Sequence, residues 1–77
     1  MEKEKQKRMR LRDLREDNDL TLQQVANLLG TSLQHYQKYE KGVYTIPTDR
    51  LEILADYYKT SVDYLLGRTS VREPYPK

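Results

Sequence analysis

Apolar residues recur at helical spacing along most of this chain, and no stretch shows the strict alternation that predicts a β-strand. Leu11 and Leu14, for example, form a narrow apolar stripe that ends where Asn18 and Asp19 interrupt it. Short helices joined by tight connections favour an all-α globular domain. The helices that the pattern predicts cover residues 9–17, 22–29, 33–41, 48–58 and 62–66.

The connection between the second and third predicted helices carries strong local signals. Thr21 is followed three residues later by Gln24, which is the spacing of a capping box at a helix start. Gly30 follows the last periodic residue, where a left-handed conformation closes a helix without a Cβ penalty, and Ser32 can cap the next helix. One helix is therefore expected on each side of a turn of about three residues.

The third predicted helix is expected to have one buried face. Tyr36 and Tyr39 should point inward with part of Glu40, and Gly42 should end the helix. The opposite face then remains available for a partner. A helix-turn-helix also needs a small residue where its helices approach closely, and Ala26 meets that need.

Residues 21–42, TLQQVANLLGTSLQHYQKYEKG, resemble the helix-turn-helix of the phage repressor and Cro family, also called the XRE family. The resemblance covers about residues 9–66. It implies a five-helix, lambda-repressor-like DNA-binding domain that acts as a sequence-specific, repressor-like transcriptional regulator. The implied partner is double-stranded DNA, bound at a palindromic operator by a homodimer. The positions that carry the resemblance are Ala26, Gly30, Tyr36, Tyr39, Glu40 and Gly42.

The family resemblance also assigns roles to individual residues. Arg15 and Glu40 match a structural ion pair that joins the first helix to the recognition helix. Gln pairs well with adenine and Lys with guanine, so Gln34 and Lys38 are the foremost candidates for base contacts. The full base-contacting set is Leu33, Gln34, Gln37 and Lys38. The residues expected to contact the DNA backbone are Leu22, Gln23, Asn27, His35 and Lys41.

Two departures from the family pattern suggest an alternative function. Leucine stands at positions 22 and 33, where relatives often have polar residues, which suits either thymine methyl groups or a protein partner. The loop at residues 43–47 contains no Lys or Arg, so modest affinity and a shallow salt dependence are expected. The alternative is a protein-interaction module or an antitoxin-type protein that binds a partner through the same domain.

The tyrosine-rich second half is the region where a dimer contact is expected. Tyrosine combines a large apolar area with a polar tip and is enriched at protein interfaces. A chain of 77 residues buries limited surface, so self-association would add stability. The predicted contact residues are Tyr58, Tyr64, Leu65 and Leu66.

Composition narrows the class of protein further. The chain has no cysteine and one histidine. We therefore expect no cofactor and no metal site, and we do not expect the protein to be an enzyme. The N-terminus is charged and no apolar stretch approaches about 20 residues, which predicts a cytoplasmic protein without membrane contact. The net charge of +2 is too small to indicate a partner by itself. We expect a charged lead-in (1–8), one domain (9–67) and an irregular tail (68–77).

Overall fold

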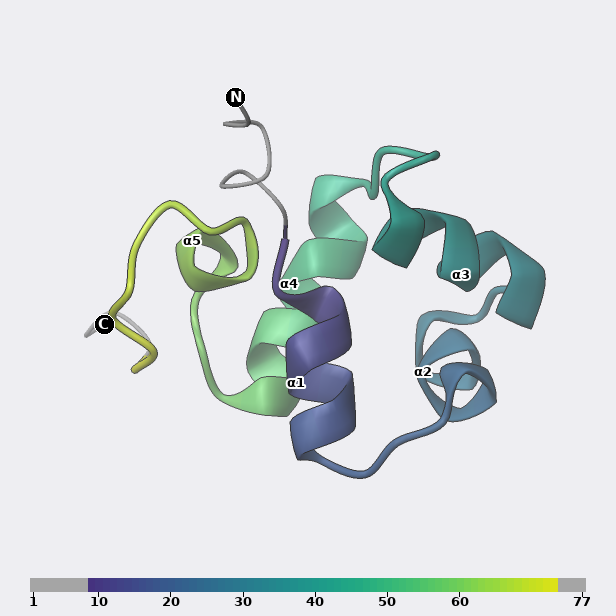
Figure 1. The fold of residues 1–77 in the computed structure, drawn as a ribbon, viewed down its shortest axis with the longest axis horizontal. Helices are drawn as coiled ribbons and strands as arrows, with labels where there is room; N and C mark the ends of the chain where they lie inside the picture. The colour runs from purple at the N-terminus through teal and green to yellow at the C-terminus, as the bar shows by residue number, and fades with distance from the viewer. Residues whose placement is uncertain (1–8, 74–77) are drawn as a thin grey trace. The chain divides into compact units, whose positions relative to one another are not determined.

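The computed structural model describes residues 9–73, and its regular structure in this range is entirely helical (Figure 1). The predicted all-α fold is confirmed. The described residues form two compact units, one of residues 11–46 and one of residues 9–10 with 47–73. The predicted lead-in and the last four residues of the predicted tail lie outside the described residues. The helices are α1 (Leu11–Asp17), α2 (Leu22–Leu29), α3 (Leu33–Lys41), α4 (Thr48–Tyr58) and α5 (Val62–Leu65).

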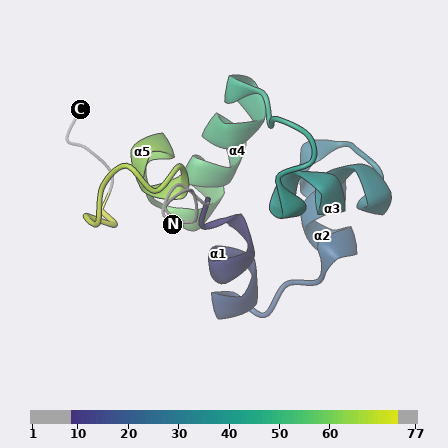
Figure 2. The ribbon, with the colours of Figure 1, turned by 45° about the horizontal axis from the view of Figure 1, so that its top comes forward.

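In the unit of residues 11–46, α2 and α3 pack against each other and form the helix-turn-helix (Figure 2). The turn between them runs from Gly30 to Ser32, as predicted. Tyr36 is fully buried, and its ring meets that of Tyr39 edge to face, with the centroids 6.2 Å apart. The buried apolar residues of this unit are Leu11, Leu14, Val25, Ala26, Leu29, Tyr36, Tyr39 and Ile46.

The ends of α2 and α3 follow from local hydrogen bonds. The Thr21 side chain accepts a bond from the Gln24 N–H, and the Gln24 side chain accepts one from the Thr21 N–H, so the predicted capping box is confirmed. Ser32 caps α3 by accepting a bond from the His35 N–H. Gly30 and Gly42 close the two helices with φ of 72° and 79°, values that glycine adopts at little cost.

The second unit consists of α4, α5 and the segments beside them. Leu51, Leu54, Ala55 and Tyr58 are the buried apolar residues of α4, and Leu65 is that of α5. Residues 68–73 contain no helix or strand. The Thr60 hydroxyl donates a hydrogen bond to the Arg72 carbonyl oxygen, which holds this segment against the end of α4.

Arg10 connects the segment before α1 to α5 within this unit. Its backbone N–H donates to the Leu65 carbonyl oxygen at 2.9 Å. Its guanidinium donates to the carbonyl oxygens of Tyr64 and Thr69 and lies 4.2 Å from the centroid of the Tyr64 ring. These contacts explain why α1 begins at Leu11 and not at Met9 as predicted, because Arg10 is bound outside the helix.

Candidate nucleic-acid interface

The helix α3 has a buried face and an exposed face. Tyr36 and Tyr39 are 0% and 4% exposed, which confirms the prediction that they point inward. Gln34 and Lys38 are exposed, as is Lys41 near the helix end, while Leu33 and Gln37 are partly exposed. The four predicted base-contacting residues are therefore all accessible on one helix.

Arg15 and Glu40 hold α1 and α3 together in the first unit. Arg15 Nε donates to Glu40 Oε2 at 2.7 Å, and Arg15 Nη2 donates to Glu40 Oε1 at 3.2 Å. The two side chains are 13% and 7% exposed, so this forked pair is largely shielded from water. The bond to Glu40 raises the pKa of Arg15. A third donor, Arg15 Nη1, binds the Leu20 carbonyl oxygen at 3.1 Å, just before α2.

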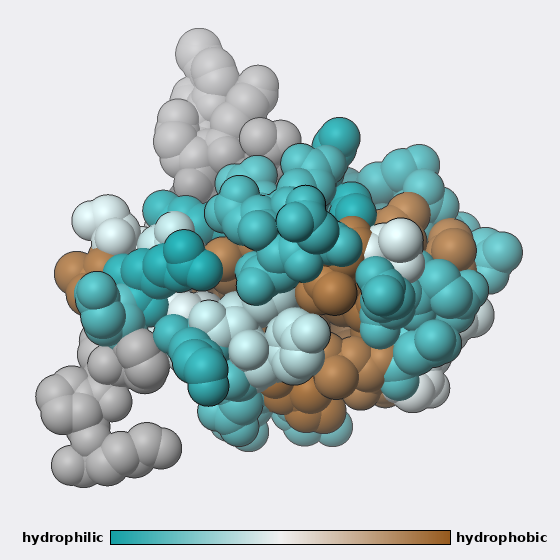
Figure 3. Space-filling model, turned by 90° about the horizontal axis from the view of Figure 1, so that it is seen from below, coloured by the Kyte–Doolittle hydropathy of each residue, from teal (hydrophilic) through white to brown (hydrophobic). Residues whose placement is uncertain are grey.

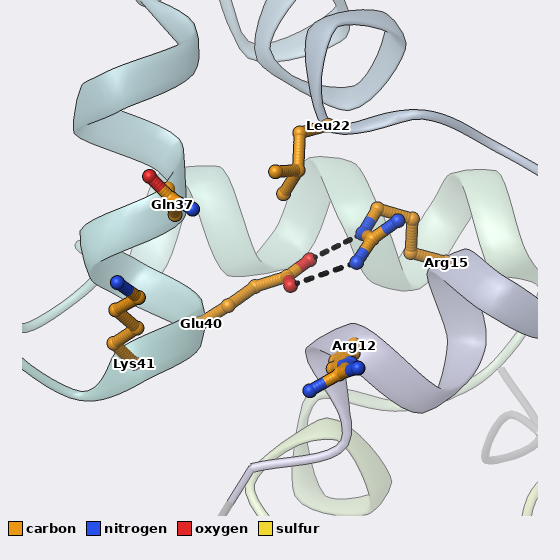
Figure 4. A pocket seen from close by; sticks show the side chains of 6 residues that line it. All are labelled: Arg12, Arg15, Leu22, Gln37, Glu40 and Lys41. Atoms are coloured by element: carbon orange, nitrogen blue, oxygen red, sulfur yellow. Dashed lines mark hydrogen bonds and ion pairs between the residues drawn. The ribbon is translucent and has the colours of Figure 1, made fainter.

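An open pocket of about 270 Å³ lies beside this ion pair (Figure 4). The Glu40 carboxylate and the Arg15 guanidinium bind each other. The other two cations that line the pocket, Arg12 and Lys41, are exposed. Leu22 supplies an apolar wall and Gln37 an amide. Such a pocket suits an anionic group of an extended ligand such as a nucleic-acid backbone. Its lining residues are Arg12, Arg15, Leu22, Gln37, Glu40 and Lys41.

Arg12 is a pocket residue that the sequence analysis did not identify. Arg12 Nε binds Glu16 Oε2 at 2.9 Å, one helical turn along α1, and this bond raises the pKa of Arg12 and lowers that of Glu16. Both side chains are mostly exposed, so the pair is weak enough to be exchanged for another anion. No local motif marks Arg12, because its importance depends on where α1 lies against α3.

The predicted backbone-contacting residues lie along α2, from its first residue to its last turn, and near the two ends of α3. Leu22 and His35 are partly exposed, and Gln23, Asn27 and Lys41 are exposed. Gln23 Nε2 donates to Asn27 Oδ1 at 2.9 Å, so these two side chains are already oriented together on α2. The structure thus brings Leu22 and Lys41 to one pocket and places Gln23 with Asn27.

An aromatic group lies at the other side of α3. His35 Nε2 and the Tyr39 hydroxyl are 3.0 Å apart, and their rings meet edge to face. The Tyr44 ring lies 4.9 Å from that of His35 and 5.5 Å from Lys38 Nζ, measured to the ring centroid. No pattern in the sequence indicated a role for Tyr44 at this site.

The predicted dimer contact needs a correction at two residues. Tyr58 and Leu65 are buried, because they pack in the interior of their own chain, so they are not available to a second copy as they stand. Tyr64 and Leu66 are partly exposed. Ile53 and Tyr57 lie one turn apart on α4 and are exposed. On the face drawn in Figure 3, hydrophobic residues reach the surface among hydrophilic ones.

Among residues 9–73, no cluster of three His, Cys, Asp or Glu side chains has an arrangement that could hold a metal ion. Over the same range, no helix combines the length and the apolar character needed to cross a bilayer.

A family model described as helix-turn-helix matches residues 11–65, which include all the described helices and the whole candidate interface. This chain belongs to that family. It is the phage repressor and Cro type of helix-turn-helix, so the resemblance inferred from residues 21–42 is confirmed.

Curated relatives of this helix-turn-helix protein are regulators by name. It is 44% identical over 68 residues to the uncharacterised HTH-type transcriptional regulator YobD of Bacillus subtilis, covering 88% of this chain and 59% of YobD. It is 37% identical to the HTH-type transcriptional regulator AnsR of the same organism, with the same coverage. A 35% identity over 58 residues links it to the cryptic phage CTXphi transcriptional repressor RstR of Vibrio cholerae, covering 75% of this chain and 52% of RstR.

The chain therefore spans between about half and three fifths of the length of these relatives. No solved structure matches this helix-turn-helix chain.

Proposed function

We propose that this protein is a sequence-specific DNA-binding transcriptional regulator that binds as a homodimer to a palindromic operator. The observation that carries the proposal is the orientation of α3, whose tyrosines are buried while Gln34 and Lys38 are exposed. Amide and ammonium groups on such a face can make hydrogen bonds to adenine and guanine in the major groove. Cytoplasmic localisation follows from the DNA partner.

The remaining contacts divide into two classes. Leu33 and Gln37 flank the foremost base-contacting residues, and the half-exposed Leu33 suits a thymine methyl group. Backbone contacts fix the register of the domain on the duplex without reading sequence. We assign these backbone contacts to Leu22, Gln23, Asn27, His35 and Lys41, and add Arg12 from the pocket.

We place the dimer contact in the tyrosine-rich region from α4 onward. Because Tyr58 and Leu65 are buried, we assign the contact to the exposed Ile53 and Tyr57 on α4 together with the partly exposed Tyr64 and Leu66. A symmetric dimer presents two recognition helices roughly 34 Å apart, so half-sites should be spaced by roughly one helical turn of DNA.

Selection of bound duplexes from a random DNA pool tests this function. We expect the purified protein to enrich a palindrome whose half-sites are centred about 10 base pairs apart. The double variant Gln34→Ala, Lys38→Ala should lose preference at specific positions within each half-site, by about 1–3 kcal/mol for each good contact. Circular dichroism should show an unchanged helical fold.

The matched control removes one amide and one ammonium from the predicted backbone contacts. Gln23→Ala with Lys41→Ala should weaken binding to all duplexes by a similar factor and leave the selected sequence unchanged. A double variant at positions 34 and 38 that keeps the original preference would contradict the assignment. If the wild-type protein enriches no sequence, the proposed regulator function is wrong, and the alternative of a partner-binding module gains support.

A further inference from the structure

The loop after α3 is tied to the carbonyl group of Lys38. This oxygen accepts hydrogen bonds from the N–H of Val43 at 2.9 Å and from the N–H of Tyr44 at 3.2 Å. Gly42, with φ of 79°, reverses the chain so that both donors reach it. The backbone of Tyr44 is therefore bound to the same residue whose side chain is the foremost candidate for contact with guanine.

The ring of Tyr44 lies close to two side chains of α3. Lys38 Nζ is 5.5 Å from the ring centroid, which is within the range of a cation–π interaction. The His35 ring is 4.9 Å from that of Tyr44 at an interplanar angle of 49°. His35 is fixed in turn by the hydroxyl of the buried Tyr39, so a continuous set of contacts runs from the core of the unit to the Lys38 ammonium.

We infer that Tyr44 is a positioning residue that holds the Lys38 ammonium for base recognition and thereby sets sequence preference. The inference rests on the proposed function. A lysine side chain has four flexible bonds, and fixing it on a base costs rotamer freedom. A ring that already restricts the ammonium reduces this cost, in the way that preorganisation improves other binding groups.

A purely structural role for Tyr44 fits less well. Tyr44 is 43% exposed, whereas Ile46, two residues later, is 3% exposed and anchors the loop. Removal of the Tyr44 ring should therefore leave the core of the unit intact. Its loss should change the side chains beside it, which are His35 and Lys38.

A double-mutant cycle on the selected operator tests the inference. Tyr44→Leu keeps an apolar side chain without a π face, and Lys38→Met keeps an unbranched side chain of nearly the same length without the charge. Discrimination at the base pair that Lys38 reads should fall about two- to fivefold in Tyr44→Leu, as expected for an exposed cation–π contact. Tyr44→Phe should retain it, and Tyr44→Leu should cause no further loss of discrimination in the Lys38→Met background.

A second measurement needs no DNA. The ring current of Tyr44 should shift the Lys38 side-chain NMR signals, and this shift should vanish in Tyr44→Leu and persist in Tyr44→Phe. The denaturant concentration at the midpoint of unfolding should be close to the wild-type value in both variants.

Two results would overturn the inference while leaving the proposed function in place. One is an equal effect of Tyr44→Leu with and without Lys38, and the other is a uniform loss on all duplexes, which would mean that Tyr44 itself touches the DNA backbone. If the wild-type protein shows no sequence preference at all, the proposed function fails, and the positioning role fails with it.

Discussion

The two arginines on α1 differ in how much their ion pairs contribute to the stability of the fold. Arg15 makes two bonds to a shielded Glu40, whereas Arg12 makes one bond to an exposed Glu16. The first pair joins two helices, and a shielded charge that loses its partner is costly. The second pair is solvated and contributes little to stability, so Arg12 remains free to exchange Glu16 for a phosphate.

Arg15→Ala is expected to lower the free energy of unfolding by about 3 kcal/mol, because it leaves the shielded Glu40 carboxylate without its partner. Chemical denaturation followed by circular dichroism measures this loss. The raised pKa keeps Arg15 charged well above neutral pH, so the loss should be the same at neutral and mildly alkaline pH. Arg12→Ala is the matched control on the same helix and should change the free energy of unfolding little, because its pair with Glu16 is exposed to solvent. If Arg15→Ala and Arg12→Ala lowered the free energy of unfolding equally, the proposed difference between the two ion pairs would be wrong.

At the residue scale, the sequence revealed roles set by local pattern or by family position. Tyr36 and Tyr39 follow from helical spacing, and Gln34 and Lys38 become exposed as a consequence. The contact of Tyr44 with Lys38 could not be predicted, because it depends on how the loop after Gly42 folds back.

At the scale of elements, prediction succeeded where helix ends are set by neighbours in sequence. The bounds of α2 and α3 agree because Thr21, Ser32 and the two glycines act within a few residues of themselves. Helix α1 begins two residues later than predicted, because the Arg10 N–H is bound by the carbonyl oxygen of Leu65, which is distant in sequence. Bonds between distant segments leave no periodic signal in the chain.

Ser32→Ala is expected to destabilise the protein by about 1 kcal/mol, because the first turn of α3 loses the acceptor for the His35 N–H. The same turn carries Leu33 and Gln34, so operator affinity should fall as well. Thermal unfolding and operator titration measure the two effects. Ser32→Asp should preserve both stability and the cap.

Ser70→Ala is a control for this substitution, because Ser70 lies exposed in a segment without helix. A loss in Ser70→Ala as large as that in Ser32→Ala would show that the cap is not the cause.

At the scale of the whole molecule, charge is close to balanced and the cations at the proposed interface are few. Lys41 and Arg12 are the exposed cations that line the described pocket, and residues 43–47 add none. If a dimer neutralises about four phosphates, the slope of log affinity against log salt should be roughly −4. Fluorescence anisotropy on the operator over a salt series measures this slope.

Lys41→Ala should reduce that slope by about 2 units in a dimer, one for each copy. Lys59→Ala removes the same charge from a residue outside the proposed contacts and should leave the slope nearly unchanged. A slope much steeper than roughly −4 would mean that cations elsewhere in the chain also meet the duplex.

The family and the all-α fold could be predicted from one 22-residue motif and its helix signals. The operator could not, because base preference depends on side-chain geometry in the complex and on the shape of the DNA. The dimer contact was only partly predictable, because tyrosine content does not distinguish the buried Tyr58 from the exposed Tyr57.

The hydrogen bonds from Arg10 to the carbonyl oxygens of Tyr64 and Thr69 determine which substitutions this part of the chain can tolerate. The guanidinium bonds end on carbonyl oxygens, which every amino acid supplies, so Thr69 can be exchanged for many other residues without loss of that bond. Arg10 itself has less freedom, because its Nη1 donates to both carbonyl oxygens while the planar guanidinium also lies over the Tyr64 ring, and the compact ammonium of lysine does not stack in that way. Position 69 should therefore tolerate many substitutions, whereas position 10 should tolerate few.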